Sequence, residues 1–274
     1  MLRDRRGNLC VEPGTTIDDY VVSGPLGHGG LGTLFRADAC GDQWVLKAFR
    51  IDPDWNESQE RECRRYFTEE CAIHPQLAHA RIVEARPAFT HDGELFLPTR
   101  FVPGGTLHAW MAPKRAPAAL RLAIRVVADI SAALDYLARK NLVHRDVSPA
   151  NILLDAHGGA LLADFGFVRP VGIAESAVGE QWSMSYGIGR WAYGAPELFD
   201  GRDHHYDHRA DIYSLGAVAI ALLTGRPPRR WPPRRYRPEI PESLAELLWA
   251  MVDDGPAARP TWAEIIAMLE SCVE

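Results

Sequence analysis

Hydrophobic and polar residues alternate in short runs along the first hundred residues, and this pattern predicts β-strands. Three runs, at 20–23, 31–37 and 43–49, are rich in β-branched and aromatic residues and are separated by Gly or Asp. Two further strand-like pieces cover 82–89 and 94–102, and Pro98 in the second predicts an edge or irregular position. Between these groups, the polar stretch 57–74 predicts a helix, with Asp52-Pro53 as an upstream start signal and Pro75 as a stop or kink.

From the Pro-Gly-Gly sequence at 103–105 onward, the periodicity becomes helical. One amphipathic face is formed by Leu120, Ile124, Val127, Leu134 and Leu137. An apolar helix over 211–223 ends at Gly225, and further helices are expected over 243–252 and from about Thr261 to the end. The pattern therefore predicts an α+β chain with a lead-in at 1–19, a small sheet-rich lobe with one helix at 20–102, and a larger, mainly helical lobe at 103–274.

Composition narrows the class of protein. The chain has 274 residues, 47% of them hydrophobic, which is enough for a substantial core. A net charge of −6 argues against a nucleic-acid partner. The five cysteines are irregularly spaced without a C-x-x-C pair, as expected for reduced thiols in a cytoplasmic protein. The N-terminus lacks the apolar stretch of a secretory signal, and the longest apolar run, 215–223, is too short for a membrane span.

A glycine-rich segment joins two of the predicted strands. Residues 27–32 read G-x-G-x-x-G, and glycines let a backbone approach phosphate oxygens closely. A strand follows this segment, whereas a dinucleotide-binding site would require a helix there. The glycine motif alone is weak evidence for a phosphate-binding site. Lys47 alone is also weak evidence, because a lysine at a strand end is ordinarily solvated.

Three motifs later in the chain allow the glycine-rich segment and Lys47 to be interpreted. Residues 143–151 read V-H-R-D-V-S-P-A-N, residues 164–166 read D-F-G, and residues 195–197 read A-P-E. In this order, from about Gly14 to the end, the chain resembles the eukaryotic-type protein kinases, in particular their bacterial serine/threonine members. The resemblance implies a bilobal kinase fold and the transfer of the γ-phosphoryl group of ATP, with Mg²⁺, to a hydroxyl of a protein substrate, most simply Ser or Thr.

The chemistry of phosphoryl transfer agrees with this resemblance. The reaction requires charge neutralisation and alignment of an oxygen nucleophile. The carboxylate of Asp146 would act as the catalytic base that accepts the proton of the substrate hydroxyl. Asn151 and Asp164 would supply hard oxygen ligands for Mg²⁺.

The resemblance assigns nucleotide contacts to the first lobe and the connection. Lys47 would hold the α- and β-phosphates, which the loop glycines Gly27, Gly29, Gly30 and Gly32 would cover. Glu70 is the expected carboxylate partner of Lys47, with Glu69 and Glu62 as alternatives. The backbone of Arg100 and Val102 would read adenine between Leu34, Val45 and Leu153, beside the gate residue Thr99.

Two further matches look structural. Asp211 resembles the buried aspartate that anchors the catalytic-loop backbone in this family. Glu197 and Arg259 resemble the ion pair that ties the activation segment to the lower lobe.

Two positions depart from the family pattern. Ser148 stands where serine/threonine members usually carry Lys, and Arg190 stands where they carry Thr. We expect Arg190 to supply the missing positive charge near the γ-phosphate; the alternative is a solvent-facing side chain. Arg145 beside the catalytic Asp indicates control by autophosphorylation of the segment 168–188, which contains Ser176, Ser183, Ser185 and Tyr186.

Alternatives remain for partners and activity. The basic, Pro-rich segment 226–238 could dock an acidic partner or could be a shortened solvated loop. The rival functions are a pseudokinase that binds nucleotide or a partner without turnover, and a kinase of small molecules; the A-P-E motif favours protein substrates.

Overall fold

A computed structural model describes residues 2–5, 7–29, 31–112, 118–172, 192–199, 207–226 and 232–272. The chain divides into two compact units, Met1–Phe101 and Val102–Glu274. The division falls one residue before the expected limit between the two lobes. Within the described ranges, none of the helices combines the length and the apolar content required to cross a membrane.

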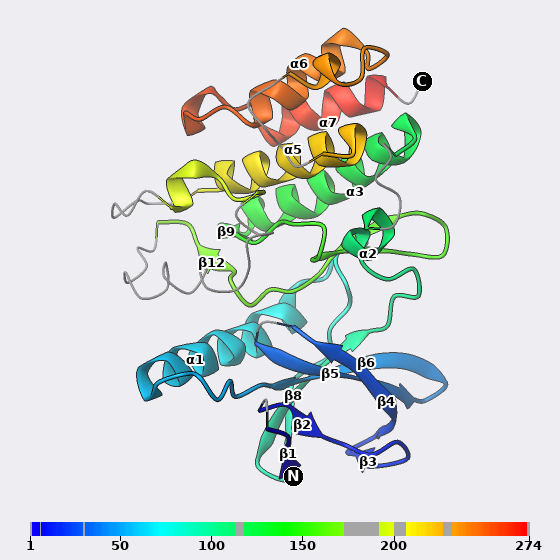
Figure 1. Cartoon of the computed structure of the whole chain (residues 1–274), viewed down its shortest axis with the longest axis vertical. Helices are drawn as coiled ribbons and strands as arrows, with labels where there is room; N and C mark the ends of the chain where they lie inside the picture. Colours follow the sequence, from blue (N-terminus) through cyan, green and yellow to red (C-terminus); the bar gives the residue numbers. More distant parts are fainter. Residues whose placement is uncertain are drawn as a thin grey trace. The chain divides into compact units, whose positions relative to one another are not determined.

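The first unit is built on a six-stranded antiparallel sheet (Figure 1). Its strands in spatial order are β3 (Thr16–Ile17), β4 (Tyr20–His28), β5 (Gly32–Ala39), β6 (Asp42–Phe49), β8 (Glu94–Arg100) and β7 (Phe89–His91). Burial alternates along the central strands, because successive side chains point to opposite faces. Phe35, Trp44 and Leu46 are in the core, whereas Leu34 and Val45 are half-buried on the other face. The three expected central strands are confirmed.

The prediction of a strand at 82–89 is wrong, because Phe89 is the only residue of that range that belongs to a strand, β7. Instead, the chain makes scattered bonds to β8: Arg86 N–H donates to the Pro98 carbonyl at 2.9 Å, and Arg100 N–H donates to the Glu84 carbonyl at 2.8 Å. Pro98 has no N–H group to donate back to the Arg86 carbonyl, so the ladder on this side of β8 is interrupted, while the ladder between β6 and β8 continues past Pro98.

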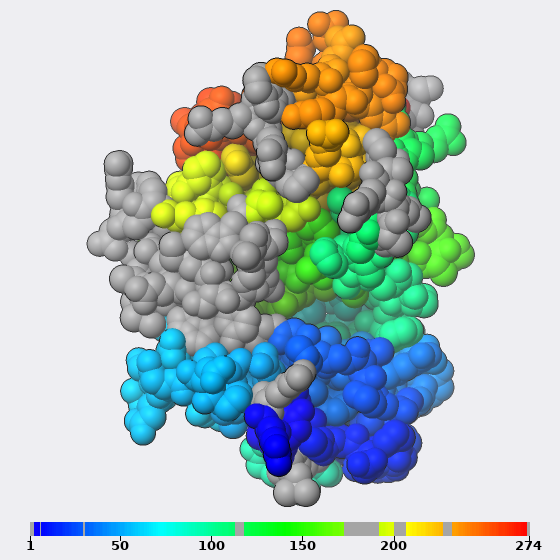
Figure 2. Space-filling view, viewed as in Figure 1, coloured from blue at the N-terminus to red at the C-terminus, as the bar shows by residue number. Residues whose placement is uncertain are grey.

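Helix α1 (Glu57–Ile73) is confirmed, and it ends directly before a 3₁₀ turn, η1 (His74–Gln76), that contains Pro75. Its start differs from the expected signal at Asp52-Pro53. Asn56 is the N-cap residue, and it forms a reciprocal capping box with Gln59. The rings of Phe49 and Phe67 lie 5.8 Å apart and join the helix to β6. Figure 2 shows α1 at the surface of this unit.

A short hairpin that the sequence did not predict precedes the sheet. It pairs β1 (Leu2–Arg3) with β2 (Leu9–Cys10), and Leu9 is buried in the core of the first unit. Residues 2–5 and 7–17, part of the lead-in expected at 1–19, thus take part in the packing of this unit.

The second unit is mainly helical (Figure 1). Its helices are α2 (Leu107–Met111), α3 (Leu120–Arg139), α5 (Arg209–Thr224), α6 (Glu242–Met251) and α7 (Trp262–Ser271). Two small antiparallel pairs carry the loops between α3 and α5: β9 (Leu142–Val143) with β12 (Arg169–Pro170), and β10 (Ile152–Leu154) with β11 (Ala160–Leu162). The expected helices are confirmed, whereas α2 and the four short strands were not predicted.

Helices α3 and α5 form the centre of this unit. Helix α3 contacts α5, α7, β9 and β11. Helix α5 is apolar on nearly every side and is buried almost throughout, as expected of a helix with no solvent face. It ends at Gly225, whose φ of 66° closes the helix in the left-handed region.

The short 3₁₀ helices of this unit are η2 (Pro196–Leu198), η3 (Pro233–Arg235) and η4 (Pro256–Ala258). Glu197 in η2 and Arg259 after η4 form a bidentate ion pair with N–O distances of 2.6 and 2.8 Å. The Arg259 side chain is 0% exposed and also donates to the carbonyls of Asp253 and Arg209. This confirms the expected pair and shows that Arg259 holds three chain segments together.

Replacement of Glu197 by Gln should therefore destabilise the second unit. The change leaves a buried guanidinium without its counter-charge, at a cost of about 3–5 kcal/mol in free energy of unfolding. Denaturant unfolding measures the loss. The matched control is Glu242→Gln, because Glu242 is 75% exposed in its 3.4 Å pair with Arg234. Equal stability of the two variants would contradict the role assigned to Glu197.

Candidate active site

Lys47 and Glu70 form a buried ion pair in the first unit. The Nζ atom of Lys47 on β6 lies 2.8 and 2.7 Å from the two carboxylate oxygens of Glu70 on α1. Both residues are at least nine-tenths buried. The alternatives Glu69 and Glu62 bind Arg65 instead, at 2.9 and 3.5 Å. The expected contact between Lys47 and Glu70 is thus confirmed, and the lysine is held in one place.

The glycine-rich loop is shaped by this lysine. A Cβ atom on Gly32 would lie 2.8 Å from Lys47 Cγ and 3.1 Å from the Ala48 carbonyl, so only glycine fits at this position. Gly27 has a φ of 138°, which an L side chain rarely adopts. The loop turns where Gly29 N–H donates to the Gly32 carbonyl at 2.8 Å. Gly30 lies outside the described residues.

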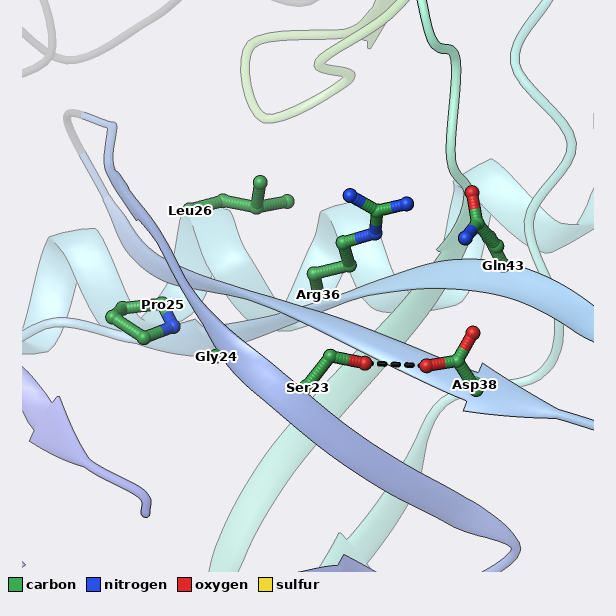
Figure 3. Close-up of a pocket in the computed structure, with 7 residues that line it drawn as sticks. All are labelled: Ser23, Gly24, Pro25, Leu26, Arg36, Asp38 and Gln43. Atoms are coloured by element: carbon green, nitrogen blue, oxygen red, sulfur yellow. Dashed lines mark hydrogen bonds between the residues drawn. The ribbon is translucent and has the colours of Figure 1, made fainter. Parts of the chain in front are cut away.

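Leu34 and Val45 lie on the same face of the sheet as Lys47. Cross-strand register pairs Leu34 with Lys47 and Arg36 with Val45, and paired residues share a face. This face continues into a hollow of about 420 Å³ at the far end of the strands. The hollow is lined by Ser23, Gly24, Pro25, Leu26, Arg36, Asp38 and Gln43 (Figure 3).

Arg36 is the residue of this face that sequence reasoning missed. Figure 3 shows its side chain extending to the same side as those of Leu26 and Gln43. Its guanidinium carbon lies 4.5 Å from the centroid of the Phe101 ring, a cation–π distance. The signal was available in the alternation of residues 34, 36 and 38 along β5, where a charged residue follows an apolar one on one face.

The residues expected to hold adenine are divided between the two units. In the first, the Arg100 N–H already donates to Glu84, so a contact to a base from this residue would use its carbonyl. Thr99 is half-buried and pairs with Val45 across β6 and β8. In the second unit, the Val102 carbonyl accepts a hydrogen bond from Gly105 N–H at 3.4 Å. Leu153 on β10 is half-buried.

Asp146 and Asn151 form the core of the loop that follows β9. The Asn151 side-chain amide donates to the Asp146 carboxylate at 2.6 Å and to the Asp146 carbonyl at 2.8 Å. Asn151 is buried, and its amide nitrogen is committed to these bonds. The arrangement orients the carboxylate and leaves the Asn151 Oδ1 atom as the oxygen that could bind a cation.

Asp164 follows β11 in the same unit. Its φ of 60° is unusual for a residue other than glycine. The next residue, Phe165, is buried, and its ring lies edge-on to the His144 ring at 5.2 Å. Packing of Phe165 on the loop before Asp146 therefore supports the backbone turn that carries Asp164.

Asp211 at the start of α5 anchors the Asp146 loop, as expected. Its carboxylate accepts from His144 N–H at 2.7 Å and from Arg145 N–H at 2.8 Å. Burial raises the pKa of the Asp211 carboxyl to about 7, against the lowering effects of these two donors and of the Arg145 charge.

Ser148 lies in the same loop and is 4% exposed. Its hydroxyl has no hydrogen-bond partner among the described residues. An isolated buried hydroxyl is costly, and a further polar group at this position would offset that cost. Arg190, the three expected phosphorylation sites Ser176, Ser183 and Ser185, and Tyr186 of the same segment lie outside the described residues.

The described cysteines are free thiols, as expected. Burial raises the pKa of Cys63 and of Cys71 to about 12, and the charges of neighbouring carboxylates add to the effect. Cys71 follows Glu70 directly, yet a thiol with so high a pKa is not nucleophilic near neutral pH.

Comparison with known proteins identifies the class. A family model described as "Protein kinase domain" matches residues 20–269. The chain is 30% identical over 259 residues to serine/threonine-protein kinase STY17 of Arabidopsis thaliana, covering 89% of this chain and 43% of that protein. It is 32% identical over 223 residues to serine/threonine-protein kinase PknJ of Mycobacterium tuberculosis, covering 78% of this chain and 35% of that protein. For PknH of the same species the identity is 31% over 224 residues, with 79% and 33% covered.

The chain therefore belongs to the protein kinase family, and the resemblance seen in its motifs is confirmed. It spans less than half the length of these relatives, at 43%, 35% and 33%.

The titration of Asp211 should appear in the stability of the second unit. The carboxyl has a pKa of about 7 when folded, against an ordinary value of 3.8, so the folded state binds more protons between these limits. The free energy of unfolding should therefore fall as the pH rises toward about 7 and level off above it. Asp211→Asn removes this contribution. The stability advantage of wild type over the variant should narrow between about pH 4 and pH 7; an advantage that is constant with pH would contradict it.

Proposed function

We propose that this chain is an active protein kinase that transfers the γ-phosphoryl group of ATP to a hydroxyl of a protein substrate, on Ser or Thr. The observation that carries the proposal is the 2.6 Å bond by which Asn151 orients the Asp146 carboxylate, in a loop anchored by Asp211. A carboxylate held in this way is suited to act on a hydroxyl placed beside it. The names of the relatives, all serine/threonine kinases, support the choice of acceptor.

Asp146 is the proposed catalytic base. It accepts the proton of the substrate hydroxyl while that oxygen forms a bond to the γ-phosphorus and the bond from phosphorus to the ADP oxygen breaks. Lys47, fixed by Glu70, binds the α- and β-phosphate oxygens. The glycine loop allows backbone N–H groups to approach the phosphates, and the close approach of Gly32 to Lys47 supports this role.

The second unit offers oxygen atoms that suit Mg²⁺. Asn151 Oδ1 and the Asp164 carboxylate are hard ligands, and two protein ligands are typical of a magnesium ion that also binds phosphates. When bound, Mg²⁺ would neutralise charge on the phosphate oxygens. Asn151 and Asp164 would hold it, while Leu34, Val45 and Leu153 would enclose the adenine and the backbone of Arg100 and Val102 would read it.

Two regulatory proposals follow from the sequence. Arg145, whose backbone is bound by Asp211, would bind a phosphate on the segment 168–188 after autophosphorylation. The segment 226–238 would receive an acidic partner. Residues 227–231 of that segment lie outside the described part of the chain. In the described part, Arg237 is committed to internal bonds with Glu239 and with the carbonyls of Ala118 and Leu223. Any docking surface there would therefore depend on other arginines.

The direct test is to incubate the purified chain with labelled ATP and magnesium and to locate transferred phosphate by mass spectrometry. Asp146→Asn keeps the shape of the side chain and removes the base, so turnover should fall by about 10²- to 10⁴-fold. ATP affinity should change by less than about threefold, because the group acts on the acceptor. The matched control is Asp254→Asn, an exposed carboxylate of the same unit. Nucleotide binding without phosphate transfer in wild type would favour a pseudokinase. Labelling of a small molecule alone would favour a kinase of small molecules.

We also propose that Arg190 provides the cation that Ser148 does not. The buried Ser148 hydroxyl without a partner among the described residues supports a polar neighbour at this point. A guanidinium near the γ-phosphate would stabilise the charge of the transition state.

Arg190→Ala should then lower turnover by roughly 10²- to 10³-fold and leave nucleotide affinity almost unchanged. Ser148→Lys combined with Arg190→Thr restores the usual family pair, and should recover more activity than the sum of the single effects predicts. The measurement is a double-mutant cycle on turnover with one acceptor. Additive effects, or an Arg190→Ala enzyme as fast as wild type, would return Arg190 to a solvent-facing role.

A further inference from the structure

The hairpin at the start of the chain lies before residue 20, where the match to the kinase family model begins. Its described residues are 2–5 and 7–10, called here the N-terminal hairpin. We propose that the N-terminal hairpin is a clamp that holds β6 and α1 in the arrangement required for the Lys47–Glu70 pair, with Arg3 as a positioning residue. The catalytic meaning of that arrangement rests on the proposed kinase function.

Arg3 makes the principal contact. Its guanidinium donates to the Glu94 carboxylate at 2.6 Å, to the Phe49 carbonyl at 2.8 Å and to the Gly7 carbonyl at 3.0 Å. The side chains of Arg3 and Glu94 are only 17% and 20% exposed, so their charge-assisted bond is largely shielded from water. One side chain thus joins the hairpin to the end of β6 and the start of β8.

A second contact fixes the turn of the hairpin against the chain that leaves β6. Ile51 N–H donates to the Gly7 carbonyl at 3.2 Å. A Cβ atom on Gly7 would lie 1.2 Å from the Ile51 carbonyl oxygen. No other residue fits at this position, so the two backbones are packed as closely as they can be.

A third contact reaches the glycine-rich loop. Leu9 is buried, and its N–H donates to the Thr33 hydroxyl at 3.3 Å. Thr33 is also buried and directly follows Gly32. The hairpin therefore contacts the base of the loop that is expected to cover the phosphates.

Phe49 connects these contacts to Glu70. The Phe49 ring packs on Phe67 of α1 at 5.8 Å and lies under the Arg64 guanidinium at 4.5 Å. Phe67 is one helical turn before Glu70, and Phe49 is two residues after Lys47. Arg3 thus fixes the backbone of the residue whose ring positions α1, and both partners of the ion pair lie next to this contact.

A set of variants of the full chain tests the clamp. Arg3→Ala removes all three bonds of the guanidinium. Glu94→Gln keeps the shape of the acceptor, and Arg3→Lys keeps the charge but replaces the fork by a single ammonium. The control is Arg5→Ala, an exposed residue in the turn of the same hairpin. Two properties are measured well below the unfolding temperature: hydrogen exchange of the α1 amides in the free protein, and the affinity for a non-hydrolysable ATP analogue with magnesium.

We expect Arg3→Ala to speed exchange in α1 and to weaken analogue binding by roughly 2- to 30-fold, the range for coupling through packed residues. Glu94→Gln and Arg3→Lys should show smaller changes in the same direction, and Arg5→Ala should match wild type. Faster exchange in the hairpin alone, with α1 unchanged, would overturn the proposal and leave the hairpin a local addition. If Arg3→Ala does not fold, the two conservative variants decide the question in the same way. The exchange result needs no turnover, so an inactive wild type would contradict the proposed function and leave the clamp intact.

Discussion

The buried carboxylate of Asp211 is the interaction on which the proposed chemistry of the second unit depends. The loop between β9 and β10 has little regular secondary structure, so its backbone groups require other partners. Asp211 supplies acceptors for two adjacent N–H groups, at His144 and Arg145. The next residue is Asp146, and its carboxylate is oriented by Asn151. One carboxyl group at the start of a buried helix thereby positions both the proposed base and one proposed metal ligand.

The first unit meets a similar requirement with an ion pair. Lys47 is charged and nine-tenths buried, a state that is stable only with a partner of opposite charge. Glu70 provides that partner from α1, so the position of the helix and the position of the lysine depend on each other. Phe49 strengthens this dependence, because its ring packs on α1 two residues beyond Lys47. Anything that moves Phe49 therefore acts on the pair.

The sequence was sufficient to predict those helices and site residues that follow from local patterns and family motifs. Apolar periodicity was sufficient for α3 and α5, and the motifs were sufficient to pair Lys47 with Glu70 and to assign Asp211 as an anchor. The missed features have separate causes. The strand expected at 82–89 failed because Pro98 cannot return a bond to Arg86. The β1–β2 hairpin was missed because its two-residue strands show no periodicity. The alternation of residues 34, 36 and 38 placed Arg36 on the face of Leu34, but its pairing with Val45 required the cross-strand register.

Six described residues other than glycine have a positive φ, and two of them lie in the loops proposed to act, while the others, Asp18, Cys40, Asp92 and Asn141, are in turns. Arg145 and Asp164 have φ values of 69° and 60°, a region that side chains other than glycine rarely adopt. Such conformations persist only where the surroundings hold them. Asp211 holds Arg145, and the packing of Phe165 against His144 holds the turn at Asp164. These contacts lie within the second unit itself, so the packing of the protein supports the proposed base and the proposed metal ligands. Groups arranged in advance need not reorganise when charge develops at phosphorus, and this is the condition under which fixed charges stabilise a transition state most strongly.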